Sequence, residues 1–171
     1  MKITLKTKRL VCEPLQHSDW DFMKRLVNSE GWLTFIGDRN IHSDQEAMDY
    51  VDRINNNPDT IYWVVKLKAK NISIGIISFV KRDYLPFHDI GFALLPEYTG
   101  RGYAKEATGK ILEMLKQHPE YQEVLAATLP SNSRSIKLLT ALGFVFQSRM
   151  ETGKKFVDIY TNNCKIGIIY F

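Results

Sequence analysis

Two glycines, Gly100 and Gly102, lie where a β-like run at 90–95 gives way to an amphipathic helix pattern. At the start of a helix the backbone N–H groups have no intrahelical partner and the helix dipole is positive, which suits a phosphate or pyrophosphate. Glycine lets the backbone approach the anion because it has no Cβ. Arg101 and Lys105 add positive charge. The segment predicts a phosphate-binding loop, and the alternative is a tight turn that binds nothing.

Three standard nucleotide motifs do not explain this loop. A Rossmann fingerprint needs a third glycine three residues after Gly102, where the chain has Lys105. A Walker loop needs Gly-Lys-Ser/Thr, and a protein kinase needs Asp-Phe-Gly with a catalytic Asp loop. Neither set occurs in the sequence.

A second segment, residues 130–144, begins with polar helix-capping residues, and its helix pattern ends at Gly143. The run before it, 123–129, predicts a strand. Alone, the segment is one more strand–helix unit of an α/β domain. Together with the first loop it resembles the GNAT family of Gcn5-related N-acetyltransferases. That family carries a Q/R-x-x-G-x-G/A loop for the pyrophosphate of acetyl-coenzyme A, then Asn-x-x-Ser/Ala and a helix ending in Leu-Gly-Phe.

The resemblance spans roughly residues 8–162. The first motif runs from Thr99 to Ala104, with Thr99 in place of the family's Gln or Arg. The second motif is Asn132-Ser133-Arg134-Ser135, followed by Leu142-Gly143-Phe144. Three flanking segments look like the RimJ/RimL branch of the family, namely Leu95-Pro96-Glu97-Tyr98, Arg9-Leu10 and Glu13-Pro14-Leu15.

The resemblance implies a mixed α/β GNAT fold in a single N-acetyltransferase domain over residues 1–171. A central, mostly antiparallel twisted sheet is expected, with helices on both faces. Strand 88–95 and strand 123–129 should run parallel, because the helix 103–117 between them is a right-handed crossover. In the family these two strands splay apart into a V, where acetyl-coenzyme A enters.

The implied activity is acetyl transfer from acetyl-coenzyme A to a primary amine, either a protein N-terminal amine or a small-molecule amine. The amine attacks directly in a ternary complex. Backbone groups of Phe92, Ala93 and Leu94 would bind the pantetheine arm like an added strand. Asn132 would orient the pantetheine region, or serve only as a helix N-cap. The pyrophosphate would be held by backbone N–H groups of Gly100, Arg101, Gly102, Tyr103, Ala104 and Lys105.

The catalytic groups follow less directly. Asp89, at the start of the central strand, is the candidate general base, with a surface carboxylate at a strand end as the alternative. Glu13 is a weaker candidate. Many family members carry a Tyr general acid seven residues after the Asn, where this chain has Leu139. Ser135 is then the remaining candidate to protonate the leaving thiolate, or else it only occupies the first helical turn. Loss of the Tyr also keeps open a non-catalytic acyl-coenzyme A binding or sensing module.

Composition restricts the remaining options. The chain has 171 residues, 44% hydrophobic and 25% charged, with a net charge of +4 and no long basic run. Such a chain is an ordinary globular one, and the mild charge argues against nucleic acid as a partner. We expect neither a membrane span nor a signal peptide. We therefore expect a cytoplasmic location. Cys12 and Cys164 are expected to be free, inert thiols. The histidines lack metal-ligand spacing, so no metal is expected.

The remaining pattern predicts the elements that position these residues. Ser18 with Asp21, and Ser43 with Glu46, form expected capping boxes of two helices. Segment 31–37 is apolar without a clear period and predicts either a buried connector or part of the acceptor pocket wall. Further strands are expected at 9–15, 61–67, 72–80, 144–149 and 156–161. The apolar tail 165–171 is expected to pack on the body of the protein or on a partner subunit of a homodimer.

Overall fold

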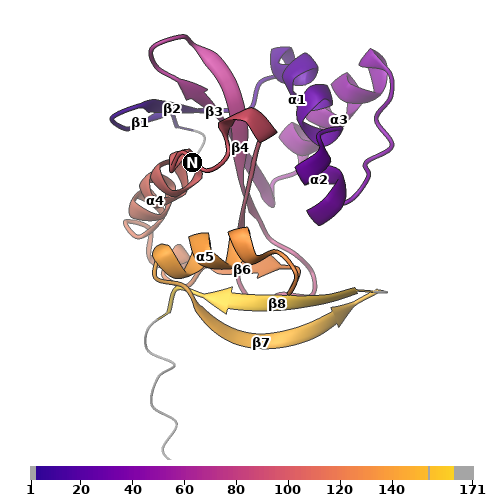
Figure 1. Cartoon of the computed structure of the whole chain (residues 1–171). Helices are drawn as coiled ribbons and strands as arrows, with labels where there is room; N and C mark the ends of the chain where they lie inside the picture. The colour runs from indigo at the N-terminus through magenta and orange to yellow at the C-terminus, as the bar shows by residue number, and fades with distance from the viewer. Residues whose placement is uncertain (1–2, 154, 164–171) are drawn as a thin grey trace, which may run out of the picture.

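An eight-stranded sheet in the order β1-β2-β3-β4-β5-β6-β8-β7 forms the centre of the protein (Figure 1). The computed structural model describes residues 3–153 and 155–163. The strands are β1 (Leu5–Lys6), β2 (Leu10–Pro14), β3 (Thr60–Leu67), β4 (Ile72–Val80), β5 (Asp89–Leu94), β6 (Leu125–Thr128), β7 (Val145–Thr152) and β8 (Lys155–Thr161). The helices are α1 (Trp20–Val27), α2 (Glu30–Phe35), α3 (Asp44–Asn56), α4 (Tyr103–Leu115) and α5 (Ser133–Ala141), with 3-10 turns η1 (His17–Asp19), η2 (Pro96–Tyr98) and η3 (Pro119–Tyr121).

All neighbouring strands run antiparallel except β5 and β6, which run parallel as the crossover through α4 predicts. These two strands share one register pair, Asp89 with Leu125, although β5 pairs with β4 along its whole length. Figure 1 shows the chain parting beyond this pair, with β6, β7 and β8 turned away from the central strands. The expected GNAT fold class, with its mostly antiparallel sheet and splayed pair, is confirmed.

Helices cover both faces of the sheet and produce two cores. On one face α4 packs with β2, β5 and β6, burying residues such as Ile90, Ile111 and Phe144. On the other face α1, α2 and α3 enclose a second core around Met23, Val51 and residues of β3 and β4. Side chains alternate between these faces along β5, since successive residues of a strand point to opposite sides.

The helix boundaries confirm one capping prediction and correct another. Ser43 Oγ accepts from the Glu46 N–H at 3.2 Å, and the Glu46 carboxylate accepts from the Ser43 N–H at 2.7 Å, so the predicted capping box of α3 is present. The box predicted at Ser18 and Asp21 is wrong. The Asp19 carboxylate instead accepts from the Gln16 N–H at 2.9 Å. The chain therefore turns into η1 two residues earlier than expected.

Segment 31–37 is largely a helix, α2, so the expectation of a buried connector is only partly right. Trp32 is buried, but Leu33 and Ile36 are 42% and 39% exposed. Adjacent positions of a helix face different sides, which separates buried Trp32 from exposed Leu33, and Ile36 lies just after the last residue of the helix.

Two predictions concern the end of the chain, a free thiol at Cys164 and a packed tail at 165–171. Both lie outside the described residues. None of the helices in residues 3–153 and 155–163 is both long and apolar enough to cross a membrane.

Candidate active site

The glycine loop joins η2 to α4 and has an unusual backbone form. Gly100 and Gly102 both have left-handed backbone conformations, with φ of +72° and +77°. Gly102 is the N-cap of α4 and supplies no side-chain cap. A Cβ at Gly100 would meet no atom within 4 Å, so conformation and not crowding requires glycine there. The first amides of α4, from Tyr103, Ala104 and Lys105, thus face outward at the positive end of the helix dipole.

Arg9, which the sequence offered only as part of a branch motif, holds this loop in place. Its Nη1 donates to the Arg101 carbonyl at 3.1 Å, and its Nε donates to Glu106 Oε2 at 2.6 Å. The guanidinium also lies 4.5 Å from the centroid of the Tyr103 ring. The segment before β2 therefore braces both the loop and the first turn of α4. Residues this far apart in the chain leave no local sequence signal, so pattern reading could not find the contact.

Glu106 is the second half of this brace. Its Oε1 accepts from the Thr7 hydroxyl at 2.5 Å and from the Arg9 backbone N–H at 2.9 Å, in addition to the Arg9 side chain. Partial burial alone would raise the Glu106 pKa, but the hydrogen bonds from Thr7 and Arg9 outweigh it and hold the pKa below its ordinary value. The carboxylate therefore stays ionised and bound to its donors at neutral pH.

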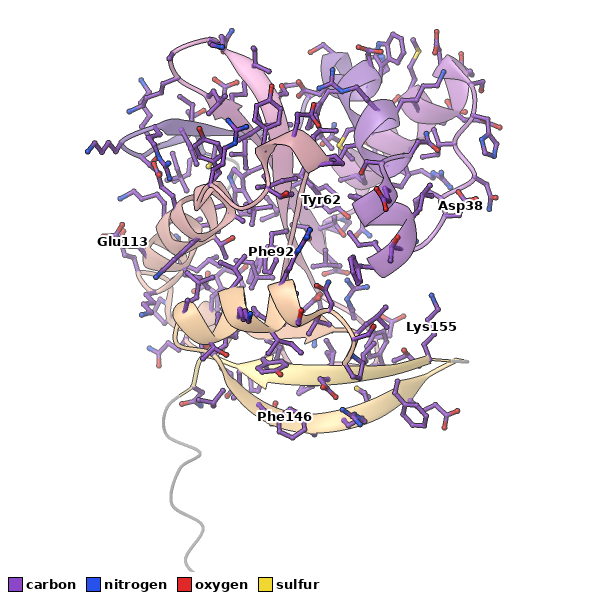
Figure 2. All side chains as sticks on the ribbon, viewed as in Figure 1. Asp38, Tyr62, Phe92, Glu113, Phe146 and Lys155 are labelled. Atoms are coloured by element: carbon purple, nitrogen blue, oxygen red, sulfur yellow. The ribbon has the colours of Figure 1, made fainter. Side chains whose placement is uncertain are left out.

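The free side of β5 is the second part of the site. The Leu95 N–H donates to the Ile74 carbonyl at 2.9 Å, which fixes the alternation of the β4–β5 ladder. By this alternation the backbone groups of Ala93 point toward β4, and those of Phe92 and Leu94 point toward β6. Since β6 pairs only at Asp89, the Phe92 and Leu94 groups face the splay. Figure 2 shows Phe92 near α5, in the part of the sheet where the strands part.

Asp89 lies at the closed end of the splay and is 3% exposed. The alternative of a surface carboxylate is therefore wrong. Its Oδ1 accepts from Arg82 Nε at 2.7 Å. Burial raises the Asp89 pKa, and the charge and hydrogen bond of Arg82 oppose this rise without cancelling it. Glu13 is not brought to this place, because it lies on β2 and pairs with Lys66 at 2.7 Å, with β3 and β4 between it and β5.

The start of α5 forms the far side of the splay. The Asn132 side-chain oxygen accepts from the Ser135 N–H at 3.1 Å, so Asn132 is a helix N-cap, as the structural alternative predicted. Ser135 is half-buried in the first turn. Leu139, where the family's Tyr would stand, is 1% exposed and part of the core that α4 covers. Leu139 therefore cannot supply the hydroxyl that the family's Tyr would supply as general acid.

Two other groups have no role in this arrangement. Cys12 is fully buried, and burial, with a smaller contribution from Glu106, raises its pKa to about 12. Such a thiol is a poor nucleophile at neutral pH. Within the described ranges, 3–153 and 155–163, no cluster of three His, Cys, Asp or Glu residues could hold a metal ion.

Comparisons with known proteins show the family of the chain. The model of the acetyltransferase (GNAT) domain family matches residues 9–145. The uncharacterized N-acetyltransferase YnaD of Bacillus subtilis (strain 168) is 24% identical over 160 residues, covering 91% of this chain and 93% of YnaD.

Solved structures show a similar fold. The ribosomal L7/L12 alpha-N-protein acetyltransferase RimL in complex with coenzyme A superposes with a TM-score of 0.81 at 14% identity, covering 93% of this chain and 97% of RimL. The ribosomal-protein-S5-alanine acetyltransferase of Vibrio fischeri gives a TM-score of 0.75 at 18% identity, covering 93% of this chain and 95% of that one.

Proposed function

The chain belongs to the acetyltransferase (GNAT) family, and from this premise we propose that it transfers the acetyl group of acetyl-coenzyme A directly to a primary amine. The observation that carries the proposal is the inner strand edge beside the glycine loop. Phe92 and Leu94 turn their backbone groups into the splay, and the outward amides of α4 lie at the end of the same strand. An extended molecule ending in a pyrophosphate matches both features.

In this proposal the pantetheine arm adds to β5 as a short strand. Its amides pair with the backbone of Phe92 and Leu94, and the Ala93 side chain forms part of the adjoining surface. The pyrophosphate binds the N–H groups from Gly100 to Lys105. Asn132 remains an N-cap whose amide nitrogen is directed by that cap and can contact the pantetheine. The thioester then lies near the closed end of the splay, where the acetyl group is held for attack.

The reaction needs one proton removed and one supplied. The amine nitrogen bonds to the thioester carbon, the carbon–sulfur bond breaks, and the thiolate leaves. We assign Asp89 as the base that accepts the amine proton, directly or through water, because burial makes this carboxylate more basic than an exposed one. We assign the Ser135 hydroxyl as the donor to the thiolate, because Leu139 has no proton to give.

The acceptor is a protein N-terminal amine or a small-molecule amine. The likeness of the fold to the ribosomal-protein acetyltransferases, and the RimJ/RimL-type segments around Arg9 and Pro96, support an N-terminal amine. The fold alone is shared at these identities, so the residues around the splay must decide the acceptor.

A thiol-release assay tests the proposal. Purified protein is incubated with acetyl-coenzyme A and a panel of N-terminal peptides and small amines, and free coenzyme A is measured with a thiol reagent. We expect release that depends on both the amine and the protein, with acetylated amine detected by mass spectrometry. Tight binding of acetyl-coenzyme A by calorimetry, with no release for any amine, would identify a non-catalytic acyl-coenzyme A module instead.

A further inference from the structure

Three aligned residues form a floor beside β5 on the face opposite α4. The register places Tyr62 of β3 beside Ser78 of β4, and Ser78 beside Gly91 of β5. Directly paired residues of an antiparallel sheet project to the same face. Ala93, two residues along β5, packs into the core of α1, α2 and α3, so the floor lies on that face. Tyr62 is labelled in Figure 2, on the side of the central strands where these helices lie.

Gly91 leaves this floor open at the strand that binds the cofactor. A Cβ at this position would lie 2.6 Å from Ser78 Oγ, so a larger residue does not fit without displacing the serine. Gly91 is half-buried although its strand is an inner one. Its neighbour Phe92 directs its backbone groups into the splay, whereas Ile90, on the other side, lies at the pair with β6. An amine over Gly91 can therefore reach a thioester in the splay from the face that α4 leaves free.

Two arginines from different loops lie around the floor. Arg39 follows α2, and Arg82 follows β4. Arg82 bonds to Asp89, which lies two residues before Gly91 on the same face of β5. Arg39 lies beside Trp32, which belongs to the same core as Tyr62. Burial, followed by the Tyr50 phenol, raises the Tyr62 pKa, whereas Arg39 and Arg82 lower it. The two charged groups that affect the Tyr62 hydroxyl, Arg39 and Arg82, are thus both positive.

Both guanidinium groups have N–H donors that bond to no other described residue. Arg82 uses Nε for Asp89, and its terminal nitrogens have no hydrogen-bond partner among residues 3–153 and 155–163. Arg39 has neither an ion pair nor a hydrogen bond within the same ranges, and its guanidinium lies 5.9 Å from the centroid of the Trp32 ring. The carboxylate of Asp89 balances the positive charge of Arg82. No ion pair at contact distance balances the charge of Arg39 within the described ranges.

Two carboxylates near Arg39 already have donors. Glu46 and Asp49 line a hollow with Arg39 on the α3 side. Glu46 accepts from the backbone N–H groups of His42 and Ser43, and Asp49 accepts from the Gln45 side chain at 2.9 Å. Neither forms an ion pair with Arg39 at contact distance in the described part of the chain. The guanidinium is available to a ligand.

We propose that the acceptor carries an anionic group, a carboxylate or a phosphate, which binds Arg39 and Arg82 while its amine lies over Gly91. This inference rests on the proposed function, since it assigns the substrate of the same site. A guanidinium pairs with either anion through two parallel hydrogen bonds. Positive charge beside the amine also disfavours its ammonium form, so the same arginines favour the neutral nucleophile.

Matched pairs of acceptors test the proposal. Each pair differs only in the anion: an amino acid and its carboxamide, O-phosphoethanolamine and ethanolamine, and peptides beginning Ser-Glu and Ser-Gln. The kcat/KM for each is measured by thiol release. We expect the wild-type protein to favour the anionic member of at least one pair about tenfold or more, as one charge-assisted hydrogen bond provides. The favoured pair identifies the anion.

Variants show whether the arginines cause the preference. Arg39→Gln should remove most of it by raising KM for the anionic acceptor, with little change for the neutral one. Arg25→Gln, an exposed change on α1, is the matched control and should keep the preference. Arg82→Lys keeps a charge beside Asp89 and should reduce the preference less.

Equal kcat/KM for both members of every pair, or a preference unchanged in Arg39→Gln, overturns the inference while leaving acetyl transfer intact. Absence of thiol release with any amine overturns the proposed function itself.

Discussion

Arg9 and Glu106 are 97 residues apart in the chain, and Arg9 Nε donates to Glu106 Oε2 at 2.6 Å. The same guanidinium donates to the carbonyl of Arg101 and lies against the Tyr103 ring. Through these contacts, the Arg9 side chain connects the N-terminal segment to the loop that we propose binds pyrophosphate. The N-terminal segment therefore braces this loop from a distant part of the sequence.

Breaking this pair should loosen the loop. In Glu106→Gln the three donors from Thr7 and Arg9 lose a charged acceptor, so we expect the free energy of unfolding to fall by about 1–2 kcal/mol. The dissociation constant for acetyl-coenzyme A, measured by calorimetry, should rise severalfold. Glu113→Gln is the control, because its pair with Lys110 lies exposed on the same helix. Unchanged affinity in a folded Glu106→Gln protein would contradict the bracing role.

The contribution of Glu106 should depend on pH in a defined direction. Its folded-state pKa lies below the ordinary value of 4.5, so the stabilisation is complete above that pH and is lost as the pH falls through the lower folded-state value. Urea unfolding of wild-type protein and Glu106→Gln from pH 7 to pH 3 measures this. We expect the difference between them to be constant above about pH 5 and to shrink below 4.5. A difference that persists unchanged at pH 3 would assign the effect to something other than the charge.

Gly102→Val should weaken binding of acetyl-coenzyme A strongly. The φ of +77° is unfavourable for a β-branched residue, and the added side chain would point toward Arg9, whose Nη2 lies 3.5 Å from the Cβ position. Gly143→Val is the matched control, since Gly143 has a φ of +84° outside the loop and carries the same kind of strain. If both variants lost affinity equally, strain and not loop contact would be the cause.

Asp89→Asn should lower kcat about 100-fold or more, because the amide cannot accept the amine proton. The affinity for acetyl-coenzyme A should stay near that of the wild type. Asp158→Asn is the control for losing a buried carboxylate, since Asp158 of β8 is also buried and bound to an arginine, Arg149 of β7. Steady-state kinetics and calorimetry separate the two effects. Equal kcat in Asp89→Asn and wild type would eliminate this base.

Ser135→Ala should slow the chemical step by removing the proposed proton donor, by about 10- to 100-fold. The Asn132 cap should survive, because it uses the Ser135 backbone N–H and not the hydroxyl. Single-turnover acetylation measures the step directly, and Ser133→Ala at the exposed start of α5 is the control. Wild-type single-turnover rates in Ser135→Ala would leave the thiolate to be protonated by water.

Local patterns predicted the elements that depend on local physics. The capping box of α3 and the β-branched strands β3 and β4 follow from residues a few positions apart. The predicted box at Ser18 is wrong because Gln16, and not Ser18, is the N-cap, and the Asp19 carboxylate accepts from the Gln16 N–H. Several neighbouring polar residues could cap this turn, and the path of the backbone decides which of them does.

The arrangement of the site could be predicted only in part. The order of strands and the resemblance to the family led us to expect Phe92, Gly102 and Asn132 along one cleft, and their roles there stay predictions. The burial of Asp89 and its bond to Arg82 depend on where the loop after β4 folds back, which no spacing encodes. The brace between Arg9 and Glu106 depends on tertiary contact alone.

The splay between β5 and β6 has a consequence for self-association. An unpaired strand edge on the outside of a sheet is a template on which another chain can add, and proteins protect such edges. Here the unpaired groups of Phe92 and Leu94 lie inside the sheet, with α4 beside one arm and α5 beside the other. A strand from another chain would have to enter between β5 and β6 to pair with them. We therefore expect these unpaired backbone groups to promote edge-to-edge association less than an outer strand edge would.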